Sequence, residues 1–122
     1  MPIITAEIFG PDTPELPQQF AEIIHDNAVT HLHSNPELLT IRVSFSSVSD
    51  RWFFNLSPLD LVRTPTFYVF APIGNGTAGN IDITRFIVET RNRLKSAMAA
   101  SYPGTTYPDL PDRNKVVVVE MP

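Results

Sequence analysis

The chain has 122 residues, of which 43% are hydrophobic and 18% charged, and its net charge is −4. These values predict one globular domain over 1–122 and are not those of a disordered protein. A negative charge without clusters of Lys and Arg argues against nucleic-acid binding. The chain has no cysteine, which excludes disulfides and thiolate metal sites. Without a signal-like start or a membrane-length apolar run, the sequence predicts a cytoplasmic protein that does not bind membranes.

The first half of the chain is predicted to form a strand, a helix and a second strand. Period-two alternation over 3–9 predicts the first strand. Thr13 followed by Pro14 predicts the start of a helix that extends to about residue 32. The second strand is expected over 39–45, with Arg42 on the face opposite to its apolar side chains. The apolar stripe expected on the helix consists of Leu16, Phe20, Ile23, Ile24 and Asn27 or Ala28.

The second half repeats this order of elements. A third strand is expected over 66–71, followed by a glycine-rich loop over 72–79. A helix is predicted from residue 80 or 82 to about residue 100, and a last strand over 115–120. The apolar stripe expected on this helix consists of Ile83, Phe86, Ile87, Thr90, Leu94, Ala97 and Met98. The proline-led segments 36–41 and 111–116 are also alike, which indicates a duplicated unit.

The repeated order predicts an α+β (α/β) fold, a duplicated β-α-β unit with pseudo-repeats over about 2–60 and 65–122. Four strands would form one mixed sheet with two helices on one face. Three of the predicted strands carry apolar residues on both faces, so both faces of the sheet need to be covered. Two helices can cover only one of them. The sequence therefore predicts an oligomer in which another subunit covers the second face.

Pro2 follows the initiator methionine and directly precedes the first predicted strand. Removal of Met1 would leave Pro2 with a free secondary amine, a base that no other residue type offers. A free α-amino group titrates at about 7.7–8.0, and burial or a nearby cation lowers such a pKa. An amine in that environment is suited to general acid/base catalysis near neutral pH.

Pro2 at the start of a doubled β-α-β chain resembles the tautomerase superfamily, over essentially the whole sequence. The segment 39–43 looks like the strand of 4-oxalocrotonate tautomerase that carries a carboxylate-binding arginine, and Arg42 falls at that position. Phe53 falls where that family places an aromatic pocket residue. The whole chain is most similar to the cis-3-chloroacrylic acid dehalogenase-like branch. The matching features are Thr13-Pro14, Phe67-Tyr68-Val69 and the closing Glu120-Met121-Pro122.

The resemblance implies a homotrimer with the sheets inside, the helices outside and cofactor-free pockets around Pro2 at the subunit boundaries. The dehalogenases carry a histidine, two loop arginines and a tyrosine where this chain has Ala28, Gly74, Thr77 and Val117. The chain also ends before the tail that supplies their acidic water activator, so dehalogenase activity is not expected. The second arginine of the 4-oxalocrotonate type is replaced by Pro11.

Two residues are candidates for catalysis, and six are candidates for substrate binding. Pro2 would transfer the proton, and the planar guanidinium of Arg42 would bind a carboxylate or stabilise negative charge. The substrate-binding candidates are Arg51, Trp52, Phe53, Phe54, Gly74 and Gly76. The aromatic side chains would exclude water, and the glycine loop would offer backbone N–H groups to an anion. The alternative roles are an interface ion pair for Arg42, a solvated turn for Arg51, a core or interface cluster for the aromatics and a flexible loop for the glycines.

Two other motifs do not predict a function. The glycines of 74–79 fit the GxGxxG pattern, but no acidic residue follows at the end of a second strand, so a dinucleotide site is not expected. His31 and His33 lack a third ligand at metal spacing, so neither a metal site nor another cofactor is expected.

The leading hypothesis is a cofactor-free tautomerase or isomerase that acts on a small keto/enol or unsaturated carboxylic acid. One alternative is a non-catalytic oligomer of the same fold that retains Met1 and binds a protein or a metabolite. Another is a dimeric α/β-barrel, cofactor-free oxygenase with a similar order of elements.

Overall fold

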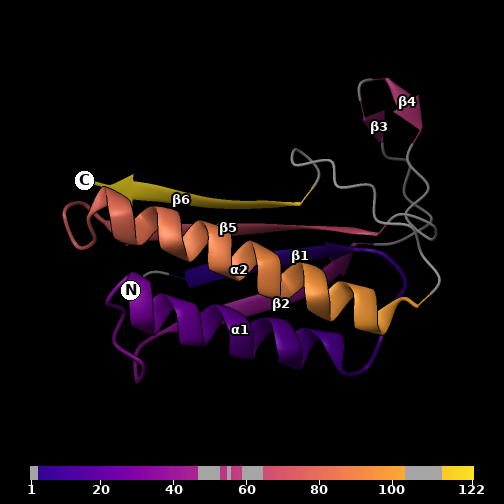
Figure 1. The fold of residues 1–122 in the computed structure, drawn as a ribbon, viewed down its shortest axis with the longest axis horizontal. Helices are drawn as coiled ribbons and strands as arrows, with labels where there is room; N and C mark the ends of the chain where they lie inside the picture. Colours follow the sequence, from indigo (N-terminus) through magenta and orange to yellow (C-terminus); the bar gives the residue numbers. More distant parts are fainter. Residues whose placement is uncertain (1–2, 47–52, 55, 59–64, 104–113) are drawn as a thin grey trace.

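The computed structural model of this chain describes residues 3–46, 53–54, 56–58, 65–103 and 114–122. Two helices and six strands follow one another in these residues (Figure 1). They are β1 (Ile3–Phe9), α1 (Leu16–His31), β2 (Thr40–Ser46), β3 (Phe53–Phe54), β4 (Ser57–Pro58), β5 (Thr66–Gly74), α2 (Asn80–Ser101) and β6 (Lys115–Met121). Neither helix is long and apolar enough to cross a membrane.

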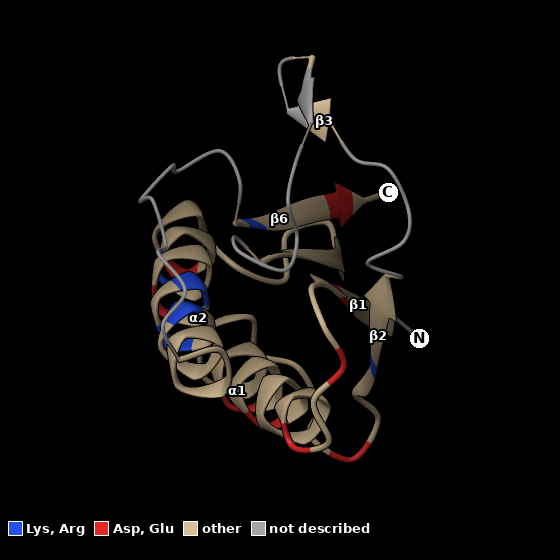
Figure 2. Ribbon diagram, turned by 90° about the vertical axis from the view of Figure 1, so that its right-hand side faces the viewer, with Lys and Arg blue, Asp and Glu red and all other residues tan. Residues whose placement is uncertain are grey.

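Four strands form one mixed sheet in the order β2-β1-β5-β6. β1 is parallel to β2 and β5 is parallel to β6, whereas β1 and β5 are antiparallel. Each parallel pair is joined by one helix, since parallel strands need a long crossover connection. Figures 1 and 2 show both helices on the same face of this sheet. The predicted fold, a duplicated β-α-β unit with two helices on one face of a four-stranded mixed sheet, is confirmed.

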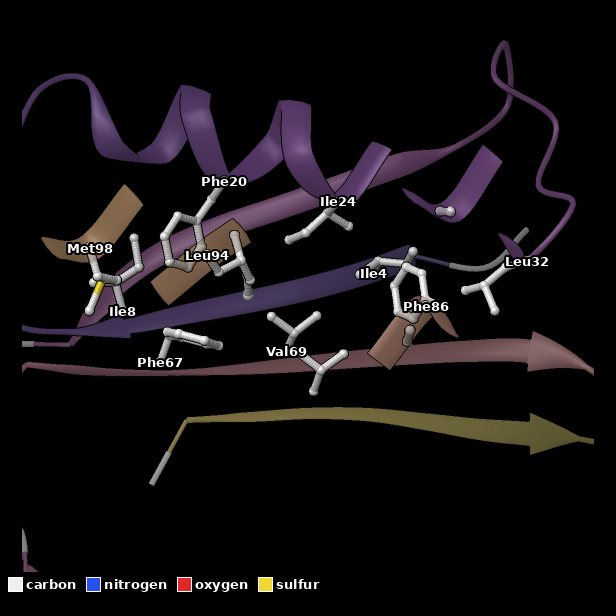
Figure 3. Close-up of a cluster of buried hydrophobic side chains, with 14 of the residues drawn as sticks. Ile4, Ile8, Phe20, Ile24, Leu32, Phe67, Val69, Phe86, Leu94 and Met98 are labelled. Atoms are coloured by element: carbon white, nitrogen blue, oxygen red, sulfur yellow. The ribbon is translucent and has the colours of Figure 1, made fainter. Parts of the chain in front are cut away.

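The hydrophobic core lies between the helices and the sheet (Figure 3). On β1 it includes Ile4, Ala6 and Ile8, which alternate with residues on the opposite face. The predicted helix stripes pack against these side chains, and the ring centroids of Phe20 and Phe67 lie 5.6 Å apart in an edge-to-face arrangement. The largest fully buried side chains include Phe20, Phe67, Phe86, Ile4, Ile8, Leu16, Ile24, Leu94 and Met98.

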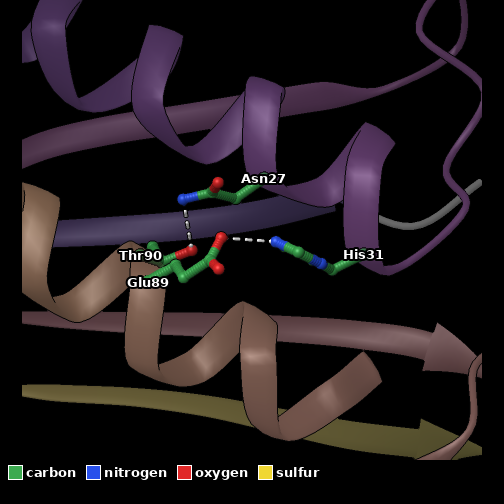
Figure 4. Close-up of polar contacts among 4 residues, drawn as sticks. All are labelled: Asn27, His31, Glu89 and Thr90. Carbon is green, nitrogen blue, oxygen red and sulfur yellow. Dashed lines mark hydrogen bonds and ion pairs between the residues drawn. The ribbon is translucent and has the colours of Figure 1, made fainter. Parts of the chain in front are cut away.

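Polar contacts connect the two helices across this core (Figure 4). The buried Asn27 side chain donates a hydrogen bond from Nδ2 to Oγ1 of Thr90 over 3.0 Å. Close to it, Nε2 of His31 lies 2.6 Å from a carboxylate oxygen of Glu89. Burial of Asn27 requires such a partner, because an unpaired amide in a core costs free energy. The contacts therefore match one face of α1 to one face of α2.

The predicted start of the first helix at Thr13-Pro14 is wrong. A helix capped by Thr13 would need the backbone N–H of residue 17 as its first donor, and Pro17 has none. α1 begins instead at Leu16, and its first turn is closed by the Gln19 N–H donating to the Glu15 carbonyl over 3.2 Å. The Thr13 hydroxyl is buried and has no hydrogen-bond partner among the residues that the structure describes.

Strand boundaries also differ from the prediction in the second half. β5 continues through Pro72 to Gly74 and pairs there with the end of β6, so the glycine-rich loop is shorter than 72–79. The register between β5 and β1 ends at Phe70, and a strand with one unpaired side can accommodate a proline. The short β3–β4 hairpin was not predicted, and Figure 1 shows it apart from the four-stranded sheet.

Candidate active site

The face of the sheet opposite to the helices is divided into a polar half and an apolar half. Its β1–β2 half carries mainly polar side chains: Thr5, Glu7, Thr40, Arg42, Ser44 and Ser46. Its β5–β6 half is mainly apolar and includes Tyr68, Phe70, Val117, Val119 and Met121. Tyr68 and Met121 are 39% and 48% exposed in the single chain. We refer to this surface as the open face.

A depression of about 310 Å³ lies on the open face and is lined by Thr5, Ala6, Glu7, Arg42, Ser44 and Tyr68. Strand pairing explains this grouping. Arg42 on β2 pairs with Thr5 on β1, and Glu7 pairs with Ser44 on one side and Tyr68 on the other. Side chains of paired residues point to the same face of a sheet, so three strands contribute to one polar surface.

Arg42 is exposed in this depression, and no acidic side chain of the described residues forms an ion pair with it. Its neighbour Glu7 is engaged differently, since the Ser46 hydroxyl donates a hydrogen bond to Oε1 of that carboxylate. A guanidinium stays charged at any physiological pH and offers two parallel N–H groups to a planar anion. The depression is therefore able to bind a carboxylate.

Three predicted site residues, Pro2, Arg51 and Trp52, lie outside the described residues. Phe53 and Phe54 form β3, and the Phe53 side chain is 60% exposed. The described residues that line the depression do not include Phe53, so the structure does not bring it together with Arg42.

Gly74 is the last residue of β5, and Gly76 lies in the turn between β5 and α2, at the end of the sheet where β1 begins (Figure 1). Gly76 has a φ of 79°, which favours glycine at this position. Two N–H groups of the turn are already used, because Asn75 donates to the Met121 carbonyl and Thr77 donates to the Gly74 carbonyl. The turn is therefore held by one hydrogen bond within itself and by one to the end of β6.

A second depression, of about 500 Å³, lies between α1 and the edge strand β2. The described residues that line it include Glu22 and Asp26 but neither Lys nor Arg. Asp26 is already 3.7 Å from a guanidinium nitrogen of Arg93, and His25 Nε2 is 3.3 Å from the Pro36 carbonyl oxygen. This negatively charged groove is poorly suited to a carboxylate, although it is the larger of the two. Within the described residues, no group of three His, Asp or Glu side chains could hold a metal ion.

The sequence predicted Arg42 and the face on which it lies, but not the residues around it. Glu7, Ser44 and Tyr68 are polar or aromatic residues at alternating strand positions, and such residues occur on many solvated strands. Only the register of β1 with β2 and β5 shows that they surround one depression. The signal present in the sequence was Glu7, the one charged residue of β1, at an outward position of that strand.

No protein-family model and no curated protein sequence matches this chain. Solved structures match its fold over almost the whole length. The structure of Pt0534 inactivated by 2-oxo-3-pentynoate has a TM-score of 0.71 and 12% identity, and covers 99% of this chain and 87% of that one. The F6 fused 4-OT wild type, an asymmetric trimer, has a TM-score of 0.70 and 12% identity. The match covers 97% of this chain and 86% of the fused 4-OT chain.

A third structure is that of N1, a member of the cis-3-chloroacrylic acid dehalogenase family, with a TM-score of 0.70 and 11% identity. It covers 97% of this chain and 75% of its own. These structures belong to the tautomerase superfamily, so the predicted resemblance is confirmed, and this chain has the tautomerase-superfamily fold. The fused 4-OT and the dehalogenase-family member have equal TM-scores, so the likeness does not distinguish between their branches.

Proposed function

We propose that this chain is a cofactor-free tautomerase or isomerase that acts on a small keto acid, with Pro2 as general acid/base and Arg42 as carboxylate ligand. The observation that carries the proposal is the guanidinium of Arg42 in the open-face depression, without an ion pair to any described acidic residue. A fold shared with superfamily enzymes supports the reaction class. The 2-oxo acid that inactivates Pt0534 supports the substrate class.

The covalent chain limits how far Pro2 can lie from the part of β1 that pairs with Arg42. Arg42 pairs with Thr5, three residues after Pro2. A chain of three residues spans at most about 11 Å, so the covalent chain alone keeps Pro2 near this part of β1. For the proposed reaction, a keto acid held by Arg42 through its carboxylate would need its carbonyl and the adjacent carbon within reach of the Pro2 amine.

The proposed reaction is a proton transfer between carbon and oxygen. The neutral Pro2 amine removes a proton from the carbon next to the carbonyl, and the C–H electron pair forms the C=C bond of the enol. The carbonyl π electrons move to oxygen, which takes the proton back from the protonated amine, so no oxidant or cofactor is consumed. Arg42 holds the carboxylate and reduces the cost of negative charge on the adjacent oxygen.

Replacement of Arg42 tests the proposal. Arg42→Gln is expected to lower kcat/KM for the enol–keto conversion of phenylpyruvate about 10²-fold, because the substrate loses its charged ligand. Arg42→Lys should be intermediate, since it keeps the charge but not the planar pair of donors. The matched control is Arg85→Gln, an exposed arginine on α2, which should leave turnover unchanged. No turnover of several keto acids by the wild-type protein would reject the proposal.

A homotrimer is proposed as the working form. The apolar half of the open face lies outside the helix-covered core, and the fused 4-OT structures are trimers. Light scattering coupled to size exclusion is expected to give three chain masses. The polar replacement Met121→Glu should shift the protein toward the monomer, while the helix-face control Val88→Glu should not. A stable monomer would contradict this expectation, and a dimer would favour the oxygenase alternative.

A non-catalytic protein of the same fold is the second candidate. Several residues of known superfamily sites are replaced in this chain, as at Ala28, Thr77 and Val117. Retention of Met1 in the native protein, measured by intact mass, would favour this candidate, because an acylated Pro2 nitrogen is not a base.

A further inference from the structure

Glu7 lies at the centre of the open-face depression. It pairs with Ser44 on β2 and with Tyr68 on β5, so its side chain stands between theirs on the middle of the sheet. Arg42 is its diagonal neighbour, because Arg42 pairs with Thr5, the preceding residue of β1 on this face. Diagonal positions are about 7–8 Å apart, which places a carboxylate and a guanidinium in the same small depression. The two do not form an ion pair.

The orientation of the Glu7 carboxylate is set by Ser46. This serine is only 8% exposed, and its hydroxyl donates a hydrogen bond to Oε1 of Glu7. Within the described part of the chain, no hydrogen bond or ion pair involves the other oxygen, Oε2, which leaves it for a ligand. An ionised carboxylate only accepts hydrogen bonds, so this side of the depression favours a ligand donor such as a hydroxyl and disfavours a second anion.

We infer that Glu7 makes the depression selective for keto acids with a single carboxylate. The carboxylate binds Arg42, and the remainder of the ligand, apolar or hydroxyl-bearing, lies toward Glu7 and Tyr68. A second carboxylate on the ligand would lie in the same volume of about 310 Å³ as the Glu7 carboxylate and would be repelled by it. Over so short a separation, repulsion between two like charges is expected to weaken binding of the ligand about tenfold. The inference deepens the proposed function, since it rests on carboxylate binding by Arg42.

Two acids with the same five-carbon chain test this selectivity: 2-oxopentanoate, with one carboxylate, and 2-oxoglutarate, with two. Calorimetry on the oligomer as isolated, at low salt, is expected to show about tenfold tighter binding of 2-oxopentanoate. Glu7→Gln should bring the ratio of the two dissociation constants close to one, mainly through tighter binding of 2-oxoglutarate. The glutamine can still accept the Ser46 hydrogen bond, so the fold should be kept, which a thermal melt checks.

The control variant is Glu37→Gln, which removes one negative charge from an exposed position before β2 and should leave the ratio unchanged. The inference is overturned if the wild type binds both acids equally, if it binds neither, or if Glu7→Gln keeps the tenfold preference. Binding does not require turnover. Selectivity without enol–keto conversion would therefore reject the proposed reaction and keep the inference, and conversion without selectivity would do the opposite.

Discussion

A form of the protein that retains Met1 is expected to convert phenylpyruvate at least about 10²-fold more slowly than the processed form. In the retained form the Pro2 nitrogen belongs to an amide, whose lone pair is delocalised and unable to take a proton. Arg42 and the rest of the sheet are unchanged by this modification, so substrate binding should persist. Intact mass establishes which form is present, and an enol–keto assay on each form measures the difference.

A primary amine provides the matched comparison. Pro2→Ala, processed to a free alanine, keeps a titratable nitrogen at the same point of the chain but loses the proline ring. It should therefore retain more turnover than the form with Met1. Equal rates for the processed and unprocessed wild-type forms would show that Pro2 is not the base. Labelling by 2-oxo-3-pentynoate, the compound that inactivates Pt0534, offers a second readout through the mass of the amino-terminal peptide.

Phe20→Ala is expected to lower the free energy of unfolding by about 3–5 kcal/mol. The Phe20 ring is fully buried between α1 and the sheet and contacts the ring of Phe67 edge to face. Truncation removes apolar surface from the core and leaves a cavity that the surrounding strands can fill only in part. Urea unfolding at a fixed protein concentration measures the change, since association also contributes to the stability of an oligomer.

The same substitution at an exposed phenylalanine shows how much of the expected loss of stability comes from burial and how much from the type of residue. Phe53 is 60% exposed on the β3–β4 hairpin, so Phe53→Ala should change the free energy of unfolding by less than about 0.5 kcal/mol. A loss at Phe53 as large as that at Phe20 would contradict the described packing, and would show that the hairpin contributes to the stable core of the assembly.

The division of the open face accounts for how one surface could serve both assembly and binding. Its β5–β6 half carries Phe70, Val117 and Val119, whose burial against another chain would stabilise an oligomer. Its β1–β2 half carries Arg42 and Glu7, which would be costly to bury without partners. In the proposed trimer, a pocket at the boundary between chains would leave this polar half accessible to a small ligand while the apolar half is covered.

Part of the candidate site could be predicted from the sequence alone. The alternation of 39–45 placed Arg42 on the face away from Ile41 and Val43, and both of these pack against the core. The position of Glu7 beside Ser44 and Tyr68 could not be predicted, because these residues are far apart in the chain and meet only through strand pairing. A shift of one residue in that register would have moved each side chain to the other face.

The sequence by itself determined the order of the four long strands and the two helices, and the inward face of β2 and of both helices, because a period of 2 or 3.6 decides which side chains can point the same way. It did not determine where α1 begins, which depended on the missing N–H of Pro17, or that β5 would continue through Pro72. The tertiary structure alone decided the sheet order β2-β1-β5-β6 and the grouping of Arg42 with Glu7. Those features depend on contacts between distant segments. The local strand and helix preferences of the chain would be equally compatible with several other pairings of the strands.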